Sequence, residues 1–219
     1  MDTSRIDNKW PVAREGIPFI VAGLFLTLLS GALGVAALAL LMGVLSLFTI
    51  FFFRDPERKN TCEERAVLTP ADGTILKIER FPEGDNPLGK PAVKISIFMS
   101  IFNVHVNRIP VEGTVVKVEY HPGRFFSANL DKASKYNEKN SVTLMTPNAG
   151  PIVVIQIAGL IARRIACWVR ERDEVVAGQR FGLIRFGSRL EVYLPLESRI
   201  VIRPRDKVKA GETIIGYLP

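Results

Sequence analysis

The chain has 219 residues, 47% of them hydrophobic, with 29 basic and 22 acidic side chains and a formal net charge of +7. This length allows one domain of ordinary size, or a smaller domain with an appendage. The composition excludes a polytopic membrane protein and an intrinsically disordered chain, and two cysteines, Cys62 and Cys167, are too few for a disulfide-stapled mini-domain.

An uncharged apolar segment runs from Ile17 to Phe53, 37 residues without Asp, Glu, Lys, Arg or His. One straight helix of this length would reach about 55 Å, against a hydrocarbon core of about 30 Å. Small and turn-prone residues cluster at 29–34, so we expect a hairpin of two helices over 17–30 and 35–53. The alternatives are a pair of buried core helices in a soluble protein and a single tilted span with an external catalytic domain.

Basic residues flank the apolar segment on both sides. Under the positive-inside rule both flanks stay in the cytoplasm, as a hairpin requires. We therefore expect a cytoplasmic segment at 1–16, a hairpin anchor in the cell (inner) membrane at 17–53, and a domain on the cytoplasmic face at 54–219. The flanking basic residues are Arg5, Lys9 and Arg14 before the segment and Arg54, Arg58 and Lys59 after it.

The net positive charge lies after the apolar segment, with seven arginines between Arg163 and Arg189. Basic groups near an anionic leaflet favour binding to phospholipid headgroups, so we expect an anionic membrane surface as a partner. Nucleic acid is the competing partner for a basic domain, but the apolar segment places this domain at a membrane. A solvated basic face without a ligand is the remaining alternative.

The rest of the chain is rich in short runs of Val, Ile and Thr bounded by Gly and Pro, which is typical of strands. They predict a mainly β, compact domain. The ten expected strands are 74–79, 92–99, 114–120, 141–146, 151–157, 165–170, 181–185, 189–194, 199–203 and 213–218.

Two internal repeats organise these strands. Residues 71–79 are similar to 111–119, and residues 173–178 are similar to 206–211. Each unit is a turn that begins a strand, as in the sandwiched hairpins of lipoyl and biotinyl carrier domains. We therefore expect lipoyl-like (barrel-sandwich-like) hairpins with pseudo-symmetry inside one fold. A non-enzymatic, membrane-tethered carrier or adaptor domain is one functional alternative.

The chain has two histidines, and both lie beside other polar residues. Asn103, His105 and Asn107 alternate with apolar residues, so we expect them to share one face of an extended segment, with Arg108 next to it. His121 is expected in a loop near the same site. Two histidines and two distant cysteines show none of the usual spacings of metal ligands, so we expect no metal.

Two turns hold the remaining candidate residues. Asp72 precedes Gly73 and by itself is typical of a turn aspartate. The dipeptide Gly187-Ser188 lies between two expected strands and is compatible with a plain hairpin turn. It also places a hydroxyl directly after the unhindered carbonyl of a glycine, which a serine activated by a nearby base could attack.

A set of segments that spans nearly the whole chain occurs in one order: the apolar pair, Phe53–Arg58, Thr69–Gly73, Phe98–Ser100 with Asn103–Arg108, Ala158–Ile165 and Phe186–Arg189. In these segments the chain resembles the proenzymes of phosphatidylserine decarboxylase, in particular their short, membrane-anchored bacterial and archaeal branch. The longer branch has Leu-Gly-Ser-Thr at the last segment and a second histidine at the position of Phe102.

The resemblance implies a self-processing enzyme whose catalytic residues are Asp72, His105 and Ser188. Cleavage between Gly187 and Ser188 would leave chains 1–187 and 188–219, and Ser188 would become a pyruvoyl group, the cofactor for decarboxylation of phosphatidylserine. An archaetidylserine decarboxylase of the same family is the nearest alternative, and a homo-oligomer is compatible with the sequence. Candidate substrate-binding residues are His121, Arg124, Arg108 and Asn103.

Overall fold

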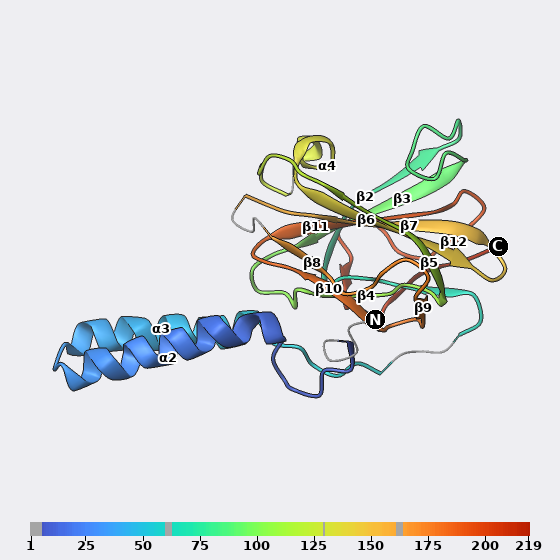
Figure 1. Ribbon diagram of the computed structural model, residues 1–219. Coiled ribbons are helices and arrows are strands. Elements are labelled where there is room, and N and C mark those ends of the chain that lie inside the picture. The colour runs from blue at the N-terminus through green and yellow to red at the C-terminus, as the bar shows by residue number, and fades with distance from the viewer. Residues whose placement is uncertain (1–5, 60–62, 129, 161–163) are drawn as a thin grey trace. The chain divides into compact units, whose positions relative to one another are not determined.

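The computed structural model describes residues 6–59, 63–128, 130–160 and 164–219 (Figure 1). The chain divides into two compact units. One unit is formed by residues 7–57, and the other by residues 58–219 together with Ile6.

The first unit is a helical hairpin. A 3-10 turn, η1 (Arg14–Gly16), leads into α2 (Ile17–Ala32), and α3 (Ala36–Phe52) follows a turn at Gly34, whose φ is +73°. These helices lie within two residues of the expected ranges. By length and composition the stretch Arg14–Ala32 could cross a membrane, and α3 is a shorter apolar helix.

Strands form most of the second unit, so the expectation of a mainly β fold is confirmed. The elements are β1 (Ala66–Leu68), β2 (Gly73–Phe81), β3 (Ala92–Met99), β4 (Val106–Arg108), β5 (Gly113–His121), α4 (Asp131–Tyr136), β6 (Lys139–Thr146), β7 (Gly150–Ile157), β8 (Ile165–Cys167), β9 (Glu174–Val175), β10 (Arg180–Ile184), β11 (Ser188–Pro195), β12 (Arg199–Ile200), β13 (Lys207–Val208) and β14 (Ile214–Tyr217).

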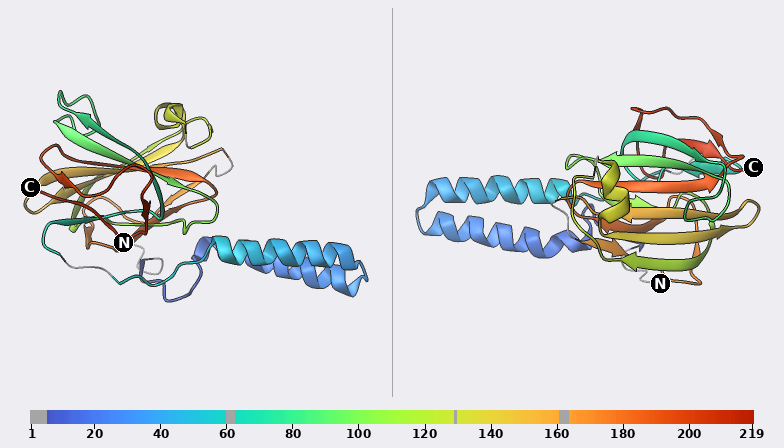
Figure 2. Two further views of the ribbon diagram at one scale, coloured as in Figure 1. Left: turned by 180° about the vertical axis from the view of Figure 1, so that it is seen from behind. Right: turned by 90° about the horizontal axis from the view of Figure 1, so that it is seen from above.

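The strands form one large antiparallel sheet and two small ones. The large sheet has the order β13-β2-β3-β11-β7-β6-β5-β9, and the small sheets have the orders β4-β10-β8 and β1-β14-β12. The β4-β10-β8 sheet lies beneath the large sheet (Figure 1), and side chains such as Ile97, Leu190 and Leu183 are fully buried. On the outer face, α4 packs through Ala133 against β7 and Tyr193 (Figure 2, right).

Each copy of the first repeat pairs with one copy of the second repeat. The start of β2 pairs with β13, with Gly73 opposite Val208, and the start of β5 pairs with β9, with Gly113 opposite Val175. Both β2 and β5 have a bulge two residues further on, before Lys77 and Lys117. The sequence repeat is therefore a structural repeat of one strand and one short partner, used twice in the same sheet.

Each of the ten expected strands occurs, but 165–170 and 199–203 are shorter than expected, ending at Cys167 and Ile200. Four short strands were not expected. They are two or three residues long, which is too short to show an alternating pattern in the sequence. They are strands because their backbone groups pair with those of a longer neighbouring strand. These strands are β1, β4, β9 and β13.

The arginines between 163 and 189 do not all lie at the surface of the domain. Arg180 and Arg189 are buried, so they belong to the interior rather than to a surface. Arg164, Arg170 and Arg172 are exposed, and Arg163 lies outside the described residues.

Candidate active site

One end of the large sheet gathers the residues around Ser188. Strand registers place a row of residues across five neighbouring pairs at this end: Thr74, Phe98, Arg189, Ile157, Lys139 and His121. Asp72 lies two residues before Thr74, directly ahead of β2, and Ser188 lies one residue before Arg189, at the start of β11. We call this part of the domain the Ser188 end.

The residues before Ser188 form a strained turn. Phe186 has a φ of +51° and Gly187 a φ of +49°, both in the left-handed region that a phenylalanine rarely adopts. Such a conformation costs about 1–3 kcal/mol and persists only where the surroundings impose it. Ser188 follows as the first residue of β11, fully buried, with its Oγ 3.4 Å from Met99 Sδ. The bond between Gly187 and Ser188 thus joins a strained, partly exposed turn to a buried strand residue.

Gly159, two residues after the end of β7, leaves space for the carbonyl of Gly187 because it has no side chain. A Cβ built on Gly159 would lie 1.9 Å from the Gly187 oxygen and 3.0 Å from its carbonyl carbon. Ala128 lies 3.4 Å from the same point. Only glycine therefore leaves room for this carbonyl at its observed position.

His105 is fully buried at the same end, just before β4. Its Nδ1 lies 3.0 Å from the backbone oxygen of Asn103, and its own carbonyl accepts a hydrogen bond from the Ile184 N–H at 3.3 Å. In a neutral ring, a proton on Nδ1 that is donated to this oxygen leaves the lone pair on Nε2. The arrangement favours the tautomer in which Nε2 can act as a base.

Asp72 is held by an arginine and by the backbone. Its carboxylate accepts hydrogen bonds from Arg58 Nη2 at 3.0 and 3.3 Å and from the Ala210 N–H at 2.7 Å. Arg58 also pairs with Glu212 at 3.1 Å. Asp72 thus lies at the same end of the large sheet as Ser188, with Arg58 as its charged partner.

The other candidate residues differ in their surroundings. Asn103 lies in a turn rather than an extended strand, and its Oδ1 accepts hydrogen bonds from the backbone and hydroxyl of Ser100 at 2.9 and 2.8 Å. Arg108 is buried, and its Nη1 donates to the Gly178 carbonyl at 2.9 Å. His121, the last residue of β5, and Arg124 are exposed at the Ser188 end.

Comparison with known proteins agrees with this geometry. The sequence profile described as phosphatidylserine decarboxylase matches residues 45–216. The phosphatidylserine decarboxylase proenzyme of Syntrophus aciditrophicus is 52% identical over 94% of this chain and 96% of its own. The proenzymes of Desulfotalea psychrophila and Geobacter metallireducens are 48% and 45% identical, over 95% and 97% of this chain and 97% and 99% of their own.

The chain belongs to the phosphatidylserine decarboxylase family. Of the segments that resemble this family, Ala158–Ile165 includes 161–163, which lie outside the described residues.

A buried row of amides, which sequence reasoning did not assign to the site, runs beneath Ser188 in this family member. Asn107 Nδ2 lies 3.7 Å from Met99 Sδ, the atom that also contacts Ser188. Asn107 Oδ1 accepts from Gln156 Nε2 at 2.9 Å, and Gln156 Oε1 accepts from Asn140 Nδ2 at 3.1 Å. The sequence feature that could have predicted this row is Gln156, a polar residue within the otherwise apolar run 151–157.

Arg189, the residue after Ser188 on β11, points to the opposite face of the sheet. Arg189 is almost fully buried and pairs with Glu191 at 2.9 Å, and its Nη2 also donates to Ser96 at 2.9 Å. Glu191 accepts from Ser134 on α4 at 2.7 Å and from the Tyr193 hydroxyl at 3.3 Å. Burial, and then the charge of Glu191, raise the pKa of Tyr193 far above its usual range, so Tyr193 stays a neutral donor. This buried ion pair fixes α4 over β11.

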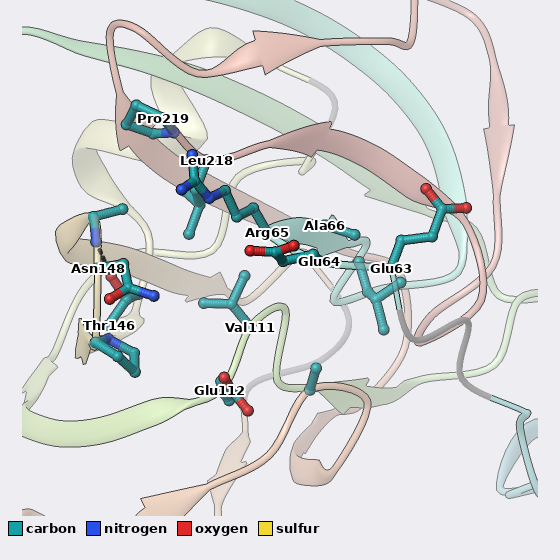
Figure 3. A pocket seen from close by; sticks show the side chains of 14 residues that line it. Glu63, Glu64, Arg65, Ala66, Val111, Glu112, Thr146, Asn148, Leu218 and Pro219 are labelled. Carbon is teal, nitrogen blue, oxygen red and sulfur yellow. Dashed lines mark hydrogen bonds between the residues drawn. The ribbon is translucent and has the colours of Figure 1, made fainter.

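The structural repeat also produces a counterpart of the site at the other end of the sheet. There Glu112 precedes Gly113 as Asp72 precedes Gly73, and a Cβ on either glycine would collide with a carbonyl of the neighbouring strand. A cavity of about 340 Å³ lies at this end, lined by Glu112, Thr146, Arg65 and the C-terminal Pro219 among others (Figure 3). It lies away from Ser188, so we do not assign it to the decarboxylase site.

Proposed function

We propose that this chain is a self-processing, pyruvoyl-dependent decarboxylase that converts phosphatidylserine to phosphatidylethanolamine and carbon dioxide at a membrane surface. Membership of the family and the names of its relatives support the substrate and the reaction. The observation that carries the self-processing is the strained Phe186–Gly187 turn, whose carbonyl packs against Gly159 directly before the buried Ser188.

The first step of maturation uses groups of this chain alone. His105 Nε2 removes the proton of Ser188 Oγ, the oxygen attacks the Gly187 carbonyl carbon, and the peptide bond is replaced by an ester. Asp72 supports the positive charge that His105 acquires, and Arg58 with the Ala210 N–H keeps the Asp72 carboxylate in place. Formation of the ester would relieve the strained left-handed conformation of Phe186, and this relief favours the ester over the peptide bond.

Elimination follows: a base removes the α-proton of residue 188, and the bond between its Cβ and Oγ breaks. Gly187 leaves with both oxygens as the carboxylate end of chain 1–187, and residue 188 becomes a dehydroalanine. Tautomerisation and addition of water release its nitrogen as ammonia and leave a ketone at the start of chain 188–219. The residues fit this group, because position 188 is buried against Met99, whose sulfur also contacts the amide of Asn107.

A pyruvoyl group at position 188 would supply a ketone that reacts with the primary amine of the serine headgroup and accepts electrons as carbon dioxide leaves. His105 is the residue we assign to return a proton to the α-carbon. We assign His121 and Arg124, exposed at the same end, to the phosphate or carboxylate of the substrate, and Asn103 to the turn that carries His105.

The helical unit supports a location at the membrane. The outward side chains of α2 and α3 are apolar, for example Phe25, Leu28 and Leu47. We propose that they anchor the protein in the inner membrane with the β domain on its cytoplasmic face, because basic residues flank both ends of the hairpin.

Intact-mass measurement of the purified protein tests this function. We expect two chains, 1–187 and 188–219, with the smaller chain blocked to Edman degradation. The Ser188→Ala variant should be a single chain without decarboxylase activity. Assays with diacyl and with ether-linked serine lipids separate the phosphatidylserine enzyme from an archaetidylserine enzyme. An intact wild-type chain from active cells would refute the proposal.

A further inference from the structure

Exposed apolar side chains gather at the Ser188 end of the β domain. Phe102 follows β3 and Leu160 follows β7, the two strands that flank β11 and Ser188. Scattered single apolar residues are normal on a protein surface, but a group beside a reactive residue indicates an interaction site. The exposed fractions are 65% for Phe102, 59% for Leu160, 49% for Tyr136 and 43% for Leu130.

The segment between β5 and β6 belongs to the same surface. Asn137, which is buried, donates from Nδ2 to the carbonyls of Phe126 and Ala158, each at 2.7 Å. These bonds tie the segment that carries Leu130 and Tyr136 to the end of β7, directly before Leu160. The views in Figure 2 show α4 at this end of the sheet.

Two exposed lysines on α4 accompany the apolar side chains. Lys132 Nζ lies 4.4 Å from the centre of the Phe126 ring, and Lys135 Nζ lies 5.5 Å from that of Tyr136. Aromatic rings next to lysines suit the boundary between lipid headgroups and acyl chains, where the ring enters the apolar layer and the ammonium stays with phosphate and carboxylate groups. The surface thus combines insertion with positive charge.

We propose that Phe102, Leu130, Tyr136, Leu160, Lys132 and Lys135 form a docking surface that inserts into an anionic phospholipid bilayer. The proposal rests on the proposed function, because the substrate is an anionic lipid held in the bilayer by two acyl chains. The positive charge of the lysines complements these headgroups, and Ser188 lies between the strands that carry Phe102 and Leu160. Docking brings the reactive position to the headgroup layer, so that the lipid need not leave the membrane.

The test uses the full chain and two forms of the same substrate. One is long-chain phosphatidylserine in vesicles, and the other is a short-chain phosphatidylserine that is monomeric in solution. We expect Phe102→Ser combined with Leu160→Ser to lower the rate on vesicles at least about tenfold, and to leave self-cleavage and the rate on the monomeric lipid unchanged. The matched control is Val176→Ser, which removes a side chain that is 62% exposed at the opposite end of β5.

The charge contribution is tested separately. Lys132→Gln with Lys135→Gln should lower the vesicle rate about fivefold per lysine at low salt, and high salt should abolish the difference. An equal loss on vesicles and on monomeric lipid would overturn the docking surface, because these residues would then act in the site itself. Unchanged vesicle activity in both sets of variants would overturn it as well.

A measurement without catalysis separates this proposal from the proposed function. In the Ser188→Ala protein, Phe102→Trp should add fluorescence that vesicles of brominated anionic lipid quench, and Val176→Trp should not. Absence of quenching at position 102 would overturn docking even if the enzyme is active. Quenching at position 102 together with a wild-type protein that neither cleaves nor decarboxylates would support docking and refute the function.

Discussion

Gly159→Ala provides a direct test of the strained turn. The new Cβ would lie 1.9 Å from the Gly187 oxygen, whereas real Cβ atoms essentially never approach closer than 3.0 Å. The Gly187 carbonyl must therefore move by roughly 1 Å, because the neighbour is backbone and cannot rotate away. Such overpacking costs about 1–3 kcal/mol of stability. A displacement of about 1 Å between reacting groups can lower a rate about 100-fold.

The assay is a time course of cleavage of freshly translated or refolded precursor, followed by intact mass. We expect Gly159→Ala to mature about 100-fold more slowly and to keep the far-ultraviolet circular dichroism of the wild type. The control is Gly113→Ala, whose Cβ would lie 2.4 Å from the Met145 oxygen at the other end of the sheet. It should lose similar stability and still cleave. Wild-type cleavage in Gly159→Ala would refute the requirement for this carbonyl position.

Three further predictions concern side chains around the site. Arg58→Gln should slow maturation roughly 10- to 100-fold, because a hydrogen bond to a charged group contributes about 1.5–3 kcal/mol. The control is Glu212→Gln, which alters the more exposed partner of Arg58 and should have little effect on the same time course. In the single-chain Ser188→Ala protein, Arg189→Met should lower the free energy of unfolding in urea by about 3–5 kcal/mol, because Glu191 is left buried without its charged partner. Adding Glu191→Leu to this variant should recover part of the lost stability. Burial raises the pKa of the Cys167 thiol, so in a Cys62→Ser background iodoacetamide at pH 8 should react with Cys167 much more slowly in the folded than in the unfolded chain; equal rates would contradict this.

The fold was predictable where the local pattern is long. The strand over 92–99 and the two helices are close to their expected ranges, because eight or more residues show an alternating or an uncharged apolar pattern. Strands such as β9 and β13 escaped prediction because only their pairing with the starts of β5 and β2 defines them. The repeated sequences did contain that information, since each repeat supplies one of the two paired partners.

The site was predictable as a set of residues but not as a set of contacts. Asp72, His105 and Ser188 came from a resemblance to a family; the strand registers place Asp72 and Ser188 at one end of the large sheet, and His105 lies directly before β4 of a small sheet. Contacts of Arg58 with Asp72, and of Gly159 with Gly187, join parts of the chain that show no sign of each other in sequence. The sequence also shows no sign that the guanidinium of Arg108, a predicted substrate-binding residue, is buried and donates to the Gly178 carbonyl.

The internal repeat explains how one end of the sheet could acquire chemistry while the other stays structural. At both ends an acid-glycine turn begins a strand, and a carbonyl of the next strand packs on the glycine. The acid at the Ser188 end is Asp72, which Arg58 and a backbone N–H hold at the same end of the sheet as Ser188. At the other end Glu112 lines an open cavity with Thr146 and the C-terminus. The acid-glycine turn thus places a carboxylate at the start of a strand at both ends of the sheet. Only at the Ser188 end does the strand order, with β11 next to β3, also bring the strained Gly187-Ser188 bond to that end.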